Sequence, residues 1–167
     1  IGVLQIHLGR YAEARHSLEQ SLHNAEQSGQ VLELIDALHQ LCFLAYRSQG
    51  EAGLRGAGTL LERLWALVKD TDYADWLASS ASLYAYHHAL NGNFAAALEF
   101  EQKSAQAMAQ YRGHPVLTEQ ILLLRYRALI AAGQPEQQRG VHRHHVLAHA
   151  APAGRAEPGR QGQVRGL

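Results

Sequence analysis

Histidine clusters are the residues of this chain whose type and spacing first suggest chemistry. Two histidines are adjacent in the middle of the chain, and four crowd its C-terminal part. They are His87, His88, His142, His144, His145 and His149. On a helix, His145 and His149 would face one ion, because residues four apart share a helix face. A metal site also needs further ligands and supporting hydrogen bonds, which the surrounding sequence does not offer. We therefore predict no metal site.

A cysteine next to a histidine is the second candidate for chemistry. Cys42 is the only cysteine and follows His39 by three residues, which would place thiol and imidazole on one helix face. Leu38, Leu41 and Phe43 surround the thiol in sequence, so a buried and unreactive cysteine is the stronger interpretation. A single cysteine also excludes an intramolecular disulfide. We expect a reducing compartment and a cytoplasmic protein.

Other signatures of catalysis or cofactor binding do not occur in the sequence. It contains no phosphate-binding glycine loop, no metalloprotease His-Glu motif and no serine nucleophile elbow. We therefore expect that the protein is not an enzyme and that it has no catalytic residues and no cofactor.

The charge distribution divides the chain into two parts. Residues 1–138 hold 10 Lys and Arg against 14 Asp and Glu, whereas residues 139–167 hold 5 against 1. A mildly acidic first part argues against nucleic-acid binding there. No apolar run approaches the roughly 20 residues that a membrane-spanning helix needs, so we expect no membrane contact.

Four glycines at a nearly constant spacing indicate a repeat. Gly9, Gly50, Gly92 and Gly133 are separated by 41, 42 and 41 residues. Each glycine follows an apolar stretch and precedes a new helical pattern, so we expect it to end a helix with a positive φ. A period of this length is typical of stacked helical hairpins, in which each hairpin completes the core of its neighbour.

Side chains after the glycines repeat as well. An aromatic residue lies two positions after Gly9 and after Gly92, and an alanine lies five positions after each. These residues are Tyr11, Ala14, Phe94 and Ala97. After Gly50 the pattern fits only if two residues are added, so we expect an irregular turn over residues 51–53.

The 3–4 spacing of apolar residues predicts an all-α fold. The predicted helices are 11–27, 31–48, 54–69, 73–90, 94–111 and 116–132. Short connections between them favour antiparallel neighbours. Residues 1–8 look like the second half of a helix, so we expect the sequence to be a fragment of a larger protein.

Residues 139–167 have a different composition from residues 1–138. They are rich in Arg, His, Gly, Pro and Gln and have no helical period. We expect an irregular or disordered tail. A GC-rich gene read out of frame gives a similar composition, so a frameshifted end is an open alternative.

The glycine, aromatic and alanine pattern of residues 1–138 resembles the tetratricopeptide repeat. The ordinary repeat has about 34 residues, and the longer spacing here is similar to variants of about 40–42 residues. Those variants occur in kinesin light chains and in large bacterial transcriptional regulators. The resemblance implies a right-handed α-solenoid of about three helix pairs, whose first helices line a concave groove. Carried over by position, the groove residues are Gln40, Leu44, Arg47, Ser79, Ser82, Tyr86, Gln120, Leu123 and Arg127.

The resemblance also implies a function without catalysis. We expect a protein-interaction scaffold that binds a peptide or a partner helix in the groove, as part of a bacterial signalling or transcriptional regulator. The alternative is a small-molecule effector-sensing domain of such a regulator. A closed, partly apolar pocket would favour sensing, whereas an open groove would favour a macromolecule. Exposed terminal helices could also lead to self-association.

Overall fold

The computed structural model describes residues 1–111 and 115–133, and every regular element in these ranges is an α-helix. The seven helices are α1 (Gly2–His7), α2 (Tyr11–Ser28), α3 (Val31–Gly56), α4 (Gly58–Val68), α5 (Ala74–Leu90), α6 (Phe94–Gln110) and α7 (Pro115–Ala131). They pack against one another, which confirms the predicted all-α class. The tail of residues 139–167, with its four histidines, lies outside the described residues.

Three of the four repeating glycines, Gly9, Gly92 and Gly133, follow the end of a helix as the sequence predicts. All four have a positive φ, between 61° at Gly50 and 77° at Gly92. This backbone conformation is accessible to glycine without the steric cost that a Cβ adds. After Gly9 and Gly92 the chain reverses within two residues and begins the next helix at Tyr11 and Phe94. Glycine spacing therefore sets the lengths of the helical hairpins.

Gly50 interrupts α3 without ending it. The residue has φ 61° and ψ −141°, whereas residues 51–56 are helical again. The expected irregular turn over residues 51–53 is therefore wrong, because the irregularity lies in the backbone of Gly50 alone. The segment after this kink folds against the segment before it. At Gly53, an added Cβ would lie 2.0 Å from the carbonyl oxygen of Ala45.

Replacement of Gly53 by alanine is expected to destabilise the protein by about 1–3 kcal/mol, as overpacking of a tight contact does. The clash is with backbone, so it can be relieved only by opening the kink. Gly56 is the matched control, because it lies in the same helix and a Cβ there would meet nothing within 4 Å. Gly56→Ala should leave the urea midpoint unchanged or raise it. Equal midpoints for the two variants would show that the kink tolerates a side chain.

The main core lies between α3, α4, α5 and α7. Its fully buried side chains include Ile35, Leu64 and Leu83, and Leu124 of α7 packs against them. Each fully buried leucine stabilises the fold by roughly 1.5–3 kcal/mol relative to an exposed one. A second, smaller cluster joins Ile6 of α1 to α2 and α3.

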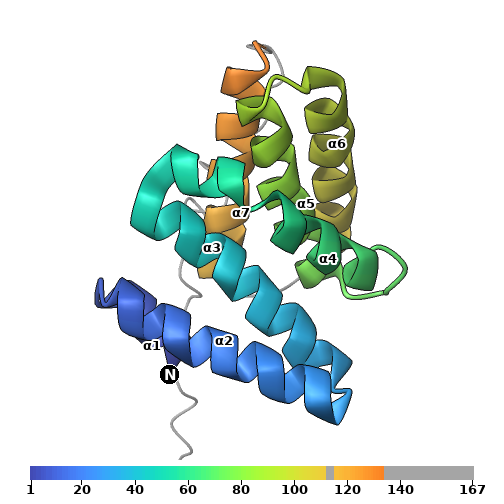
Figure 1. Ribbon diagram of the computed structural model, residues 1–167. Helices are drawn as coiled ribbons and strands as arrows, with labels where there is room; N and C mark the ends of the chain where they lie inside the picture. The colour runs from blue at the N-terminus through green and yellow to red at the C-terminus, as the bar shows by residue number, and fades with distance from the viewer. Residues whose placement is uncertain (112–114, 134–167) are drawn as a thin grey trace, which may run out of the picture.

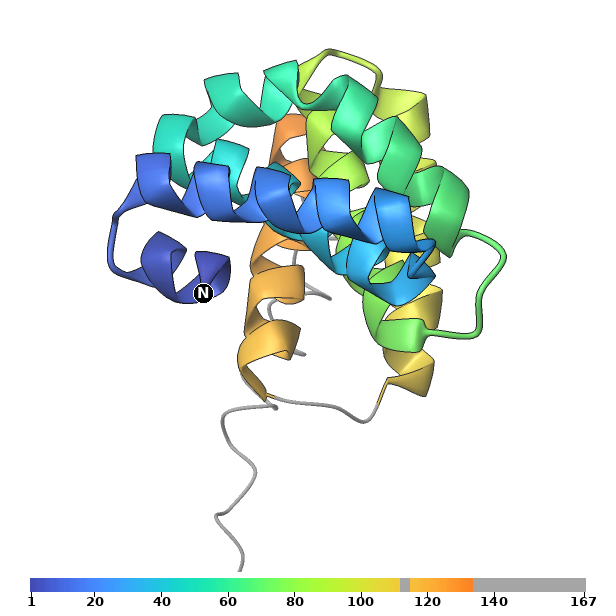
Figure 2. The same ribbon diagram turned by 60° about the horizontal axis from the view of Figure 1, so that its bottom comes forward.

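The helix α5 occupies the centre of this arrangement. It packs against α3, α4, α6 and α7, and nine of its 17 residues are buried. In Figures 1 and 2, α1 and α2 lie together at one end of the molecule, and α5, α6 and α7 lie together at the other. Among the described helices, backbone contacts of α1 and α2 are limited to each other and to α3. The helix α3 thus connects the two ends of the molecule.

Candidate binding face

The nine predicted groove residues do not share one surface. Arg47 and Leu123 are exposed, and Gln40, Gln120 and Arg127 are partly buried. The other four side chains are buried, and they are Leu44, Ser79, Ser82 and Tyr86. The expectation that these four line an open groove is therefore wrong for this structure. Partner binding by the remaining five residues stays a prediction.

Helix packing explains why the prediction fails at these four positions. The side chain of Leu44 closes the cluster that holds Ile6 of α1. The three residues of α5 are buried because this helix contacts neighbours on all sides. The repeat pattern implies that α5 has one face free of other helices. In the structure α5 has no face wide enough to expose these three side chains.

Two of the predicted arginines do meet in one pocket. Arg47 of α3 and Arg127 of α7 line a shallow, open pocket of about 350 Å³, together with Tyr11, Tyr46 and Glu51. The guanidinium of Arg127 lies over the ring of Tyr46, at 5.5 Å from its centroid. A cation over an aromatic face is held by the ring quadrupole, which fixes its position without neutralising it.

Neither arginine of this pocket has an ionic partner in the described part of the chain. The guanidinium of Arg47 lies over the ring of Phe43, at 6.0 Å from its centroid. None of the ion pairs formed by the described residues includes Arg47 or Arg127. The pocket therefore presents two positive charges that remain available to an anionic group.

The carboxylate of this pocket is engaged elsewhere. The hydroxyl of Tyr86 donates a hydrogen bond of 2.7 Å to Oε1 of Glu51. Burial, followed by this bond to a carboxylate, raises the pKa of Tyr86, so the phenol keeps its proton and stays a donor. Tyr86 also packs edge to face on Tyr46, with ring centroids 6.0 Å apart. Tyr86 thus supports the floor of the pocket from below rather than facing a partner.

The candidate nucleophiles are buried. Cys42 is fully buried, and desolvation raises the pKa of its thiol to about 12. His39 instead hydrogen-bonds Ser79, with Nε2 and Oγ 2.5 Å apart. A Ser–His pair resembles the start of a catalytic triad, but Ser79 and His39 are only 3% and 6% exposed. A substrate cannot reach either group, so we interpret the pair as a structural contact. Sequence spacing gives no signal for it, because the two residues lie on different helices.

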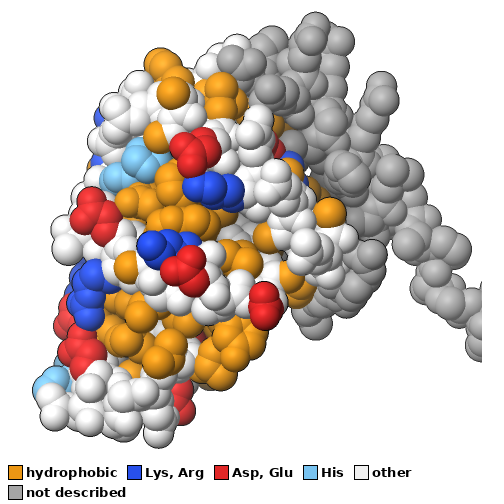
Figure 3. Space-filling view, turned by 90° about the vertical axis from the view of Figure 1, so that its right-hand side faces the viewer, with side chains coloured by type: hydrophobic (Ala, Val, Ile, Leu, Met, Phe, Trp, Pro, Cys, Tyr) orange, Lys and Arg blue, Asp and Glu red, His pale blue; other side chains and the backbone are white. Residues whose placement is uncertain are grey.

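The face on the side of α4 and α6 differs from the arginine pocket. Hydrophobic side chains alternate there with charged ones (Figure 3). Trp65 of α4 and Phe100 of α6 pack edge to face, and the ammonium of Lys103 lies over both rings. Lys103 also donates a 2.6 Å hydrogen bond to Glu99. Lys103 is therefore already paired with a carboxylate, unlike the two arginines of the pocket.

In the described ranges, no group of three or more His, Cys, Asp or Glu side chains is placed to hold a metal ion. None of the helices described is both long enough and apolar enough to cross a membrane. The histidines of the C-terminal part lie outside these ranges.

Comparison of the chain with protein-family models, curated proteins and solved structures gives no significant match. The resemblance to the tetratricopeptide repeat therefore stays a prediction from the glycine spacing.

Proposed function

We propose that this chain is a non-enzymatic scaffold that binds an acidic peptide or partner helix at the arginine pocket. The proposal includes the finer fold expected from the sequence, a right-handed solenoid of helix pairs. It is supported by which of the described helices contact one another. Each helix packs on its neighbours in the chain, and successive odd-numbered helices pack on one another. Membership in a bacterial regulator is proposed on the repeat resemblance alone.

One observation carries the proposal. Arg47 and Arg127 come from helices that are far apart in sequence, yet they line the same open pocket and have no carboxylate partner in the described residues. Guanidinium groups form strong, directional hydrogen bonds with carboxylates. Two unpaired guanidinium groups carry little desolvation cost here, because the pocket is open to water. Both groups are therefore available to an acidic ligand.

The shape of the pocket favours a macromolecular ligand over a small effector. Small-molecule sites bury most of the ligand surface inside a concave, largely apolar cavity. This pocket is shallow and open, and three of its six lining residues are charged. A peptide or helix lying across it would add contacts beyond its rim. Such a ligand gains the area that the pocket itself cannot supply.

The test is a charge-matched pair of double variants. A fluorescein-labelled helical peptide with glutamates on its exposed face serves as the probe, and fluorescence anisotropy measures its Kd. Arg47→Ala with Arg127→Ala is expected to weaken binding at least about tenfold, because two charge-assisted hydrogen bonds are lost. The control is Arg15→Ala with Arg63→Ala, which removes the same charge from two exposed ion pairs.

Two results would contradict the proposal. The first is equal loss of affinity in both double variants, which would indicate nonspecific attraction to net charge. The second is equal binding of a peptide in which every glutamate is replaced by glutamine. Binding by the wild type should also weaken as salt is raised from 0.05 to about 0.5 M, because the Debye length shortens.

A further inference from the structure

The arginine pocket contains a carboxylate of the chain itself. Glu51 lines the pocket together with Arg47 and Arg127, and its side chain is exposed. A carboxylate that shares an open pocket with two guanidinium groups is expected to pair with one of them. In the described part of the chain, Glu51 forms no ion pair with either arginine. Another contact must therefore hold this carboxylate away from the two cations.

The backbone brings Glu51 to the pocket. It follows Gly50, which also lines the pocket and has φ 61° and ψ −141°. Glycine adopts this backbone conformation without the strain that a Cβ would add. Gly53 then packs closely on the carbonyl oxygen of Ala45, which fixes residues 51–56 against the helix before the kink. The fold thus sets the position of Glu51 beside the arginines, and only its side chain can choose a partner.

The partner that Glu51 has is Tyr86 of α5. The hydroxyl of Tyr86 donates a 2.7 Å hydrogen bond to Oε1 of Glu51. The rest of Tyr86 is buried, so the hydroxyl is held in place. Its ring packs on the ring of Tyr46, over which the guanidinium of Arg127 lies. One pair of aromatic rings therefore holds Arg127 on one side and Glu51 on the other, and it keeps the two opposite charges apart.

We propose that Tyr86 is a positioning residue that keeps the arginine pocket open by holding Glu51 away from the two arginines. Without the hydroxyl of Tyr86, the Glu51 carboxylate pairs with Arg47 or Arg127 and competes with an acidic ligand from within the chain. The effect on ligand binding rests on the proposed function of the pocket, whereas the position of Glu51 does not. A break in the Tyr86–Glu51 hydrogen bond therefore closes the pocket to ligands.

The first test is a crystal structure of Tyr86→Phe, which removes the hydroxyl and keeps the ring. The Glu51 carboxylate is expected within hydrogen-bond distance of the guanidinium of Arg47 or Arg127. Arg55 is the competing cation, because it lies one helical turn after Glu51 in the same helical segment. A carboxylate that points into solvent, or that pairs with Arg55, would overturn the proposal whether or not the pocket binds peptides.

The second test measures binding of the glutamate-bearing helical peptide by fluorescence anisotropy on the full chain. Tyr86→Phe is expected to raise the Kd about threefold, because the ligand must displace an exposed ion pair. Addition of Glu51→Gln to Tyr86→Phe should restore the Kd of Glu51→Gln alone, since an amide has no charge to pair with an arginine. A purely structural role of Tyr86 would give the same loss with and without Glu51→Gln.

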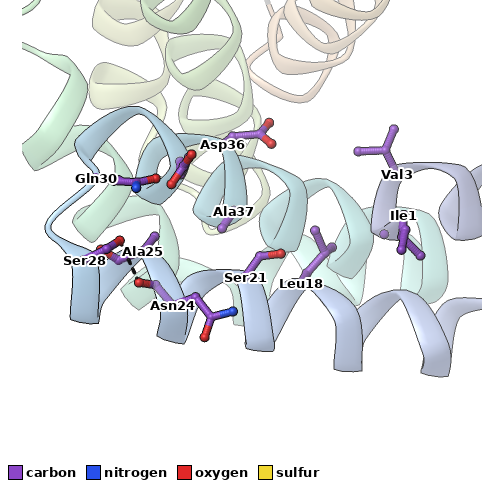
Figure 4. Close-up of a pocket in the computed structure, with 12 residues that line it drawn as sticks. Ile1, Val3, Leu18, Ser21, Asn24, Ala25, Ser28, Gln30, Asp36 and Ala37 are labelled. Carbon is purple, nitrogen blue, oxygen red and sulfur yellow. Dashed lines mark hydrogen bonds between the residues drawn. The ribbon is translucent and has the colours of Figure 1, made fainter.

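Two matched controls make the same chemical changes outside the pocket. Tyr84→Phe removes a hydroxyl two positions earlier on α5, from a ring that packs on Phe100. Glu33→Gln removes a carboxylate from a separate pocket between α2 and the beginning of α3 (Figure 4). Glu33 lies about 24 Å along α3 from the kink, well beyond the Debye length at physiological salt. Both controls should bind the peptide like the wild type.

The outcomes separate this proposal from the proposed function. Equal losses in Tyr86→Phe and Tyr84→Phe, or a loss that Glu51→Gln does not reverse, would refute the role of Tyr86 alone. If Arg47→Ala with Arg127→Ala leaves the Kd unchanged, the proposed function fails. The crystal structure of Tyr86→Phe then still decides whether Tyr86 holds Glu51 away from the arginines.

Discussion

Replacement of Glu101 by alanine is expected to lower the free energy of unfolding by about 3–5 kcal/mol. Arg125 of α7 donates from Nε and Nη2 to Oε1 of Glu101 in α6, at 3.0 and 2.6 Å. Both side chains are only 10% exposed. Removal of the carboxylate leaves a guanidinium between helices with neither water nor a counter-charge. Urea denaturation measures the loss.

The same pair predicts how stability can be restored. Replacing both residues by methionine removes both charges and keeps apolar volume, so Glu101→Met with Arg125→Met should recover most of the loss. The control is Glu99→Ala on the same helix, which breaks the exposed pair with Lys103 and should lower the free energy of unfolding far less, because solvent screens this pair. If Glu101→Ala costs no more than Glu99→Ala, the pair is not buried in the way described.

Acid is expected to destabilise the protein through His39. Complete burial lowers the pKa of this imidazole from 6.5 to about 4, although the nearby charge of Asp75 acts in the opposite direction. Between pH 6.5 and 4 the unfolded chain binds a proton at His39 and the folded chain does not. The stabilisation is therefore complete above pH 6.5 and is lost as the pH falls to about 4. A shift of this size corresponds to roughly 3 kcal/mol.

The measurement compares unfolding free energies at pH 7 and pH 4. His39→Gln removes the titrating group and should reduce the difference between the two pH values by roughly 3 kcal/mol. His23→Gln replaces an exposed histidine of α2 and should leave the difference unchanged. The idea fails if His39→Gln and the wild type lose the same stability on acidification.

The regular features of the fold follow from local sequence signals. Glycine ends a helix because of its own backbone freedom, so Gly9 and Gly92 are sufficient to predict where one helix ends and the next begins. Helix boundaries agree to within two residues for α2, α5 and α6. The exceptions are α3, which bends at Gly50 and continues to Gly56, and α4, which therefore begins at Gly58 and not at residue 54.

The binding face could not be predicted in the same way, because it depends on how helices pack. The exposure of a residue is set by neighbours that are distant in sequence. Ser79 meets His39 across two helices, and Tyr86 reaches Glu51 beyond the kink. The buried Glu101 occupies the position where α2 has Leu18, so the repeat pattern predicts an apolar residue there. Only Arg47 and Arg127 meet in one pocket, and their partner contacts stay predictions.

The central position of α5 also determines how the molecule would come apart. A helix that touches four others cannot leave without disrupting all of them, so α3 to α7 should behave as one cooperative unit. The pair α1 and α2 rests mainly on α3 and is held by far fewer neighbours. Its detachment would leave the larger unit folded and would expose the face of α3 against which the pair packs. We therefore expect α3 to α7 to resist heating longest and α1 and α2 to unfold first.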